Sequence, residues 1–336
     1  MLVKRVLLSA TRSAAFEMFI GLLERVSGER PDLLRVLTYH RVDEPEAHPT
    51  LCPSLISASP ADFEQQMAYV ADNYTVVSMA EVLDVYQRGT SLPPRSVLLT
   101  FDDAYCDFAE HAWPVMKRYG LPVTLFVPTG FPDQPRRTFW WDRLYHAMNK
   151  PKSRRLVDTP LGLLPLTTPA QRGDAFRVLR DYMKTLGHQE AMWLVDRVCR
   201  QVGSRLPEHY VLNWDSLRSL AREGVTLAPH TRTHPLLNRV PPAVAREEVV
   251  GSLRDLERKI GRVPPVFAYP SGACDDEVTG ILDKEGFVLA FATRRGINDL
   301  RQTDRLRLRR INVGRRTTEP ILRAQLLPWS RYLSWS

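Results

Sequence analysis

The nine residues from Val97 to Tyr105 read VLLTFDDAY, an apolar and β-prone run that ends in two adjacent carboxylates. An apolar run of this length, rich in residues that favour strands, is typical of a buried β-strand. Asp102 and Asp103 repel each other, and each loses solvation at the edge of a hydrophobic core. The sequence therefore indicates that either water covers both carboxylates or a cation meets them there.

Similar apolar runs alternate with helical patterns along the chain. Strands are expected at 33–40, 74–79, 96–101, 123–127, 225–228, 266–269, 287–292 and 306–313. Helices are expected at 60–73, 82–86, 108–119, 216–224, 244–260 and 278–286. This alternation predicts βαβ units and a parallel sheet. Because the chain has no G-x-G-x-x-G or Walker sequence, we expect an α/β barrel without a nucleotide cofactor rather than a dinucleotide-binding sheet.

The alternation is interrupted between about 131 and 213, where two helical stretches flank a short hairpin at 156–166. We expect a mostly helical insertion on the side of the barrel that carries active sites. Trp140 and Trp141 are predicted to fill the core of this insertion, and a sugar-stacking platform is the alternative. The catalytic domain would cover 31–336.

Residues 1–30 begin like a secretory signal, but Arg12 and Glu17 interrupt the apolar run. The segment therefore makes neither a good signal core nor a spanning helix. Read at helical period, it is an amphipathic helix with its apolar face formed by Leu7, Phe16, Phe19, Ile20, Leu23 and Val26. We expect this helix to pack on the body of the protein, with contact to a membrane surface as the alternative.

The composition is that of an ordinary soluble protein: 44% of the 336 residues are hydrophobic and 25% are charged. The four cysteines are scattered, which excludes a zinc-finger type of site and favours a reducing compartment.

The net charge is +8, and ten arginines crowd the C-terminal part: Arg294, Arg295, Arg301, Arg305, Arg307, Arg309, Arg310, Arg315, Arg316 and Arg323. We expect a solvated face or attraction to an anionic partner such as a membrane, but not to nucleic acid, because no recognition motif accompanies the charge.

Polar side chains follow several of the expected strands. They are His40, Asp102, Asp103, His230, His234 and the segment AYPSGACDD that starts at Ala268. In an α/β barrel the C-terminal ends of the strands share one face, so these residues can converge. His230 and His234 are four positions apart, which lets both imidazoles reach one ion if the turn is helical.

Two histidines and one carboxylate form a metal site that leaves positions open for water and substrate. The second carboxylate can then accept the proton of a metal-bound water. The same ligand set also occurs in iron oxygenases. A second carboxylate beside the metal ligands favours hydrolysis.

The motifs TFDDAY, HTRTH and FAYPSG resemble those of the polysaccharide deacetylases, the NodB-homology family of carbohydrate esterase family 4. The resemblance spans about 34–313 and implies a distorted (β/α)7 TIM-like barrel that hydrolyses N-acetyl groups on sugars. It implies that Asp102 is the general base and that Asp103, His230 and His234 hold a divalent metal. Zinc is the expected ion, with Co²⁺, Ni²⁺, Fe²⁺ and Mn²⁺ as alternatives. It also implies an oxyanion and substrate-binding set of Tyr105, Tyr269, Pro270, Ser271 and Gly272.

Two positions depart from the family pattern. The arginine that often orients the base is replaced by Ala268, and the C-terminal Leu-x-His that supplies the general acid is missing. LTYH, which ends at His40, is similar to the opening strand of a circularly permuted branch that acts on exopolysaccharides. On this resemblance His40 is the general acid, and a buried structural histidine is the alternative.

The expected substrate is an N-acetylated amino sugar in a surface polysaccharide, a glycolipid or a lipid-linked precursor. A cyclic amide and a weakly catalytic sugar-binding role are the alternatives. Because no convincing signal peptide is present, we expect a cytoplasmic protein, with peripheral contact to the inner membrane through the N-terminal helix or the arginine-rich part. The sequence makes no prediction of the oligomeric state.

Overall fold

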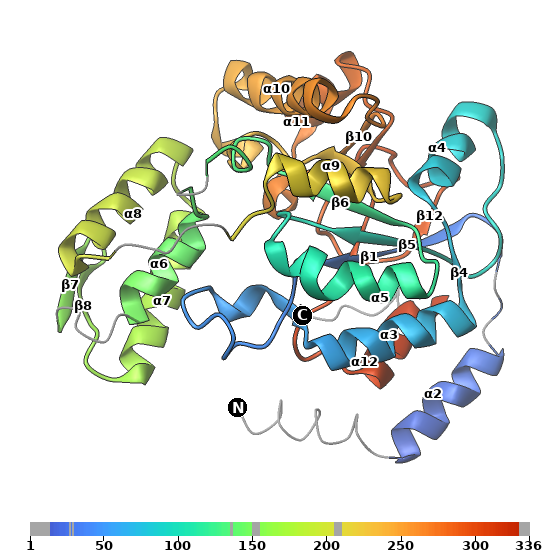
Figure 1. The fold of residues 1–336 in the computed structure, drawn as a ribbon, viewed down its shortest axis with the longest axis horizontal. Helices are drawn as coiled ribbons and strands as arrows, with labels where there is room; N and C mark the ends of the chain where they lie inside the picture. The colour runs from blue at the N-terminus through green and yellow to red at the C-terminus, as the bar shows by residue number, and fades with distance from the viewer. Residues whose placement is uncertain are drawn as a thin grey trace.

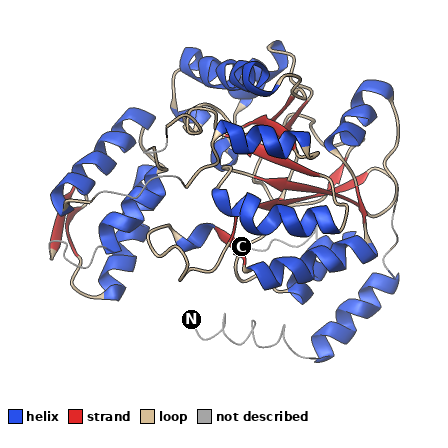
Figure 2. Ribbon diagram, viewed as in Figure 1, coloured by secondary structure: helices blue, strands red, loops and turns tan. Residues whose placement is uncertain are grey.

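A computed structural model describes residues 14–26, 28, 30–134, 137–149, 155–204 and 210–328. The first half of the expected N-terminal helix, with Leu7, lies outside these residues. Figure 1 shows a central barrel with helices around it and the insertion to one side. Figure 2 shows most of the strands enclosed by these helices and a separate hairpin in the insertion. The α/β barrel predicted from the alternation of strands and helices is confirmed.

Seven of the parallel strands in the described part of the chain correspond to those that a (β/α)7 barrel requires. They are β1 (Leu33–Tyr39), β5 (Ser96–Phe101), β6 (Val123–Val127), β9 (Thr226–Pro229), β10 (Val266–Ala268), β11 (Leu289–Phe291) and β13 (Ile311–Asn312). Strand β1 lies between β13 and β5, so the first and last of these strands are neighbours. The β10–β11 pair forms a separate small sheet, which distorts the barrel.

The expected strand at 306–313 is wrong in extent, because only its last part, β13, is a strand. The side chain of buried Asn298 bonds both backbone groups of Arg309, through Nδ2–H to the carbonyl (2.8 Å) and Oδ1 to the N–H (2.8 Å). These groups are then not available to a neighbouring strand. The remaining short strands are β2 (Arg41–Val42), β3 (Ile56–Ala58), β4 (Thr75–Val76) and β12 (Asn298–Asp299).

The outer layer of the barrel consists of helices. These helices are α3 (Pro60–Asn73), α4 (Met79–Arg88), α5 (Trp113–Arg118), α9 (Trp214–Arg222), α10 (Pro242–Ile260), α11 (Asp276–Lys284) and α12 (Glu319–Leu326). Side chains cap the starts of α3, α4, α9 and α11. A π-helical turn (Phe108–Ala112) precedes α5, and short 3-10 turns lie at Pro53–Leu55, Leu237–Arg239 and Pro270–Gly272. Helix α4 begins before the expected position because Ser78 and Glu81 form a capping box.

The insertion is mostly helical, as predicted, and has its own hydrophobic core. It contains α6 (Trp140–Asn149), the hairpin β7 (Leu156–Thr159) and β8 (Gly162–Pro165), α7 (Pro169–Met183) and α8 (His188–Val202). Buried Asp142 joins it to the barrel side, because its carboxylate accepts bonds from the Tyr105 hydroxyl (2.6 Å) and the Cys52 N–H (2.7 Å). Since Asp142 is on α6 and Tyr105 follows β5, these bonds fix the insertion beside the strand that carries the paired aspartates.

The described part of the N-terminal helix, α2 (Ala14–Val26), packs against α12. Ile20 is buried there, and Glu24 accepts a hydrogen bond from Arg323 at 2.7 Å. Met18, Phe19 and Leu22 are exposed, so packing buries only one side of the helix. Within the described ranges, none of the helices has the length and hydrophobicity that a membrane span requires.

Candidate active site

Parallel strand pairing brings the predicted site residues to one end of the barrel. Tyr39 of β1 pairs with Phe101 of β5, and the Asp102 N–H donates to the Tyr39 carbonyl at 2.9 Å. His40 and Asp102 therefore follow neighbouring strands at the same level. His230 directly follows β9, and its N–H donates to the carbonyl of Val127 at the end of β6 (3.1 Å).

Asp103, His230 and His234 form a buried cluster. The Asp103 Oδ1 atom lies 3.3 Å from Nε2 of His234 and 3.6 Å from Nε2 of His230. One ligand atom from each of the three residues lies within 4.8 Å of the others. The two histidines, four positions apart, do bring their rings to the same ligand cluster. The segment between them is a strained turn and not a helix, because Thr231 and His234 have φ of 65° and 60°.

A contact behind the cluster holds the imidazole of His230 in the orientation that a metal needs. The Nδ1–H of His230 donates to the carbonyl of Ala268 at 2.7 Å, which leaves its Nε2 with a free lone pair. Burial lowers the pKa of His230 to about 4, so the ring is neutral. Glu248 fixes the loop itself by accepting bonds from the N–H groups of Arg232 and Thr233.

The donor set fits a divalent metal. Burial opposes ionisation of Asp103, but the charges of His234 and His40 outweigh this effect and hold its pKa below the usual value. The buried Oδ1 atom of Asp103 has no hydrogen-bond partner among the described residues. Ligand atoms about 2.0–2.2 Å from one zinc ion at tetrahedral angles lie ~3.4 Å apart, which is close to the separations found here.

Arg310 holds the other carboxylate, Asp102. Nη1 donates to Oδ1 at 2.9 Å and Nη2 donates to Oδ2 at 2.8 Å, while Nε donates to the carbonyl of Ala292. Burial alone would raise the pKa of Asp102, but the charge of Arg310 more than offsets it and keeps the pKa well below the usual value. The expectation that the arginine-rich segment is a solvated or partner-binding face is wrong for Arg310, which is fully buried.

Sequence reasoning missed Arg310 because it looked for the missing arginine at Ala268. One signal for it is present. Leu306, Leu308 and Arg310 alternate with Arg307 and Arg309, and the parity of the two buried leucines places Arg310 on the inward side.

A cavity of about 160 Å³ opens over these groups and is lined by His40, Asp102, Asp103, His230, His234, Ser271 and Thr293 from the barrel. The insertion contributes Trp140, Trp141, Phe176, Arg180 and Lys184 to its wall. Trp141 does pack in the insertion core, stacked on Phe139 at 4.5 Å. Trp140 packs against the same core but is only partly buried, and both tryptophans line the cavity.

The remaining predicted residues lie next to the cavity without lining it. The Tyr105 hydroxyl donates to Asp142 and accepts from Trp141 Nε1 (2.9 Å), and the Tyr269 hydroxyl donates to the Leu306 carbonyl (2.9 Å). Pro270 is buried. Gly272 faces a neighbouring cleft instead. Of this set, the structure brings only Ser271 to the cavity.

The family model for polysaccharide deacetylases matches residues 89–159 and 172–290, more than half of the chain. The chain belongs to the polysaccharide deacetylase family, a family of carbohydrate deacetylases. The matched ranges include the aspartate pair and both histidines, but they exclude His40 and Arg310.

Relatives and solved structures agree with this assignment. The Bacillus subtilis (strain 168) protein YxkH is 20% identical over 81% of this chain and 68% of its own length. The poly-β-1,6-N-acetyl-D-glucosamine N-deacetylase of Escherichia coli (strain K12) is 28% identical over 39% of this chain, but the match spans only 20% of that enzyme. The deacetylase PplD of Streptococcus pyogenes, solved with acetate, superposes with a TM-score of 0.60, at 21% identity, over 88% of this chain and 99% of its own. The distorted (β/α)7 barrel is thereby confirmed.

Proposed function

We propose that this protein removes N-acetyl groups from an amino sugar with Asp102 as general base. The observation that carries this proposal is the arrangement in one cavity of a carboxylate fixed by Arg310 and an Asp–His–His cluster. The name of the Escherichia coli relative and the family match support a polysaccharide N-deacetylase.

Asp103, His230 and His234 would hold the divalent ion, for which zinc is our first choice. Such an ion supplies Lewis acidity toward the acetyl carbonyl and toward a water. Asp102 stays ionised because Arg310 lies against it. Each oxygen of its carboxylate keeps an acceptor position beside its bond to Arg310, so Asp102 can take the proton of the attacking water.

His40 would protonate the leaving amine. It lines the same cavity as Asp102 and Asp103. Its backbone N–H donates to Ser57 Oγ at 3.0 Å, which ties the residue to β3. Because β1 pairs with β5, His40 and Asp102 follow neighbouring strands although they are far apart in the sequence.

Ser271 has a φ of 52° and lines the cavity. The N–H groups of Gly272 and Ala273 close a turn on the carbonyls of Tyr269 and Pro270. The Ser271 N–H is therefore our candidate for the donor that stabilises the oxyanion of the tetrahedral intermediate. Trp140 would stack on the sugar ring.

The substrate class that we propose is a surface polysaccharide, a glycolipid or a lipid-linked precursor. One side of α2 is packed on the protein and the other exposes Met18, Phe19 and Leu22. This exposed apolar side supports peripheral contact with the inner membrane from the cytoplasm.

Acetate release from a panel of acetylated sugars tests the proposal. The panel contains chitooligosaccharides, poly-β-1,6-N-acetylglucosamine oligomers and a cyclic amide, each with and without a chelator. We expect acetate from at least one sugar, loss of activity after chelation and recovery with Zn²⁺. Hydrolysis of the cyclic amide alone, or sugar binding without acetate release under any divalent ion, would contradict the proposal.

A further inference from the structure

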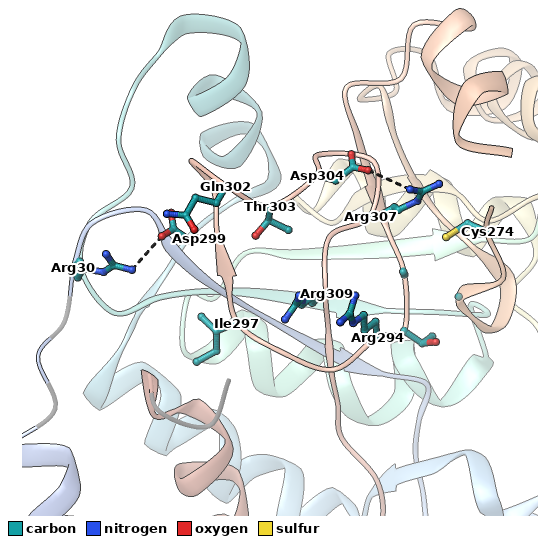
Figure 3. A pocket seen from close by; sticks show the side chains of 13 residues that line it. Arg30, Cys274, Arg294, Ile297, Asp299, Gln302, Thr303, Asp304, Arg307 and Arg309 are labelled. Atoms are coloured by element: carbon teal, nitrogen blue, oxygen red, sulfur yellow. Dashed lines mark hydrogen bonds and ion pairs between the residues drawn. The ribbon is translucent and has the colours of Figure 1, made fainter. Parts of the chain in front are cut away.

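A second cleft, of about 1030 Å³, lies beside the catalytic cavity (Figure 3). Its lining comes largely from 292–309, the segment after β11, in which β12 is the one regular element that the structure describes. An α/β barrel usually covers each strand with a helix. The cleft therefore lies where no helix follows strand β11 before β13 among the described residues.

Arginine side chains line this cleft, and two of them lack an acidic partner. Arg30 pairs with Asp299 at 3.1 Å, and Arg307 pairs with Asp304 at 3.8 Å and also bonds Asp276. Among the described residues, no ion pair is found for Arg294 or Arg309. Figure 3 shows the first two pairs as dashed lines and none at Arg294 or Arg309.

Arg309 is held in place although its guanidinium is unpaired. Asn298 bonds its backbone on both sides. Its side chain runs over Gly296, where an added Cβ would lie 2.8 Å from Arg309 Cδ. A half-buried arginine with a fixed backbone has lost part of its freedom before any ligand binds, which lowers the entropic cost of binding.

The cleft adjoins the catalytic cavity. Thr293 lines both spaces, and its hydroxyl donates to the carbonyl of Ser271 at 3.1 Å. Gly272 lies on the cleft side of this contact and approaches so closely that an added Cβ would lie 2.2 Å from Thr293 Oγ1. Only the thin Ser271–Gly272 turn and Thr293 therefore separate the two spaces.

We propose that Arg294 and Arg309 bind an oxyanion of the substrate, a phosphate or a carboxylate, that is attached to the sugar being deacetylated or to the unit next to it. This inference rests on the proposed function and narrows its substrate class to anionic glycans or glycosyl phosphates. Guanidinium groups bind both kinds of oxyanion in a bidentate manner. The cleft is concave, so it suits a substituent on a flexible glycan better than the flat surface of a bilayer.

Equilibrium binding to the full-length protein tests the proposal without relying on turnover. The ligands are chitotetraose, which is neutral, N-acetylglucosamine 1-phosphate and UDP-N-acetylglucosamine, which carry phosphate, and a hyaluronan tetrasaccharide, which carries carboxylates. The variants are R294Q/R309Q and the matched control R88Q. Arg88 is an exposed arginine of α4 that pairs with Asp84 away from both cavities. Unchanged circular dichroism spectra check that the variants fold.

We expect at least one anionic ligand to bind more tightly than chitotetraose, and R294Q/R309Q to weaken its binding at least tenfold, as for the loss of charge-assisted hydrogen bonds. Chitotetraose should bind the three proteins within about twofold. The phosphate and carboxylate ligands distinguish the two sources of the oxyanion. Equal weakening of the neutral ligand, or no difference between wild type and R294Q/R309Q, would overturn the inference.

Two further readouts separate other outcomes. If R294Q/R309Q no longer binds phosphatidylglycerol vesicles but still binds every anionic sugar as wild type does, the cleft binds a membrane surface and the inference fails. If the arginine-dependent binding is found but no sugar ever releases acetate, the proposed function fails while the oxyanion site stands. If acetate is released and the arginines have no effect on binding, only the oxyanion site fails.

Discussion

Arg310 and Asp102 form two parallel hydrogen bonds, of 2.9 and 2.8 Å, between a fully buried guanidinium and a carboxylate that are 208 positions apart in the chain. The same arginine bonds the Ala292 carbonyl at the end of β11. It thereby ties the last part of the barrel to the proposed base. Arg310 is a positioning residue, because it acts on the reaction through Asp102.

Replacing Arg310 with lysine should lower kcat/KM about 10- to 100-fold, because one charge-assisted bond replaces a bidentate pair. Arg310 lowers the pKa of Asp102, and a lysine keeps the charge but not both hydrogen bonds, so this pKa should rise part of the way toward the usual value. The acidic limb of the pH profile of kcat/KM should therefore move to higher pH. R88K should leave the profile unchanged, and an unshifted limb in R310K would show that Arg310 is only structural.

Substitution of the two aspartates should separate metal binding from proton transfer. D103N should lose the metal, since Asp103 Oδ1 faces Nε2 of both histidines. D102N should keep the metal and lose at least ~100-fold in kcat. Metal analysis of the purified variants and acetate release give both quantities. Equal loss of metal in the two variants would contradict the division of roles.

Replacing His40 with glutamine should preserve metal content but reduce kcat by about 10²- to 10⁴-fold, as expected for loss of a general acid. A substrate with a good leaving group, such as an acetylated aryl amine, should be less affected because its departure needs less protonation. If turnover of the sugar is unchanged in H40Q, another group protonates the amine.

Trp140 should contribute to sugar binding. W140A should raise KM about tenfold and leave metal content and the free energy of unfolding nearly unchanged, because Trp140 is only partly buried. W141A is the informative contrast. Its ring stacks on Phe139 and its Nε1–H donates to Tyr105, so we expect it to destabilise the insertion by ~3 kcal/mol or more. Unchanged KM in W140A would place the sugar elsewhere.

Asp142 should make stability depend on pH. Burial raises its pKa to about 6, so the folded state binds this proton more tightly than the unfolded state. Its contribution to stability is present below the ordinary aspartate pKa and is lost as the pH rises through about 6. Chemical unfolding from pH 4 to 7 should show D142N gaining stability relative to wild type as the pH increases. A constant difference between the two would contradict the raised pKa.

The sequence by itself predicts much of the fold, because strand and helix patterns depend on residues that are near each other in the chain. The apolar run before Asp102 and the capping residue Ser59 are local signals of this kind. Together with the rule that parallel strands end on one face, they place His40, Asp103 and His230 near one another. The insertion and its hairpin follow from the same local patterns.

Only the tertiary structure determines which distant side chains meet. Arg310 pairs with Asp102 because short strand β13 lies next to β1, and the bonds of Asn298 to Arg309 fix the local path of the chain. Although they are adjacent in the chain, Arg309 lines the open cleft, whereas Arg310 is buried and binds Asp102. Composition shows only a run of arginines there. Their separation depends on strand register and on packing, and a linear sequence specifies both only through the complete fold.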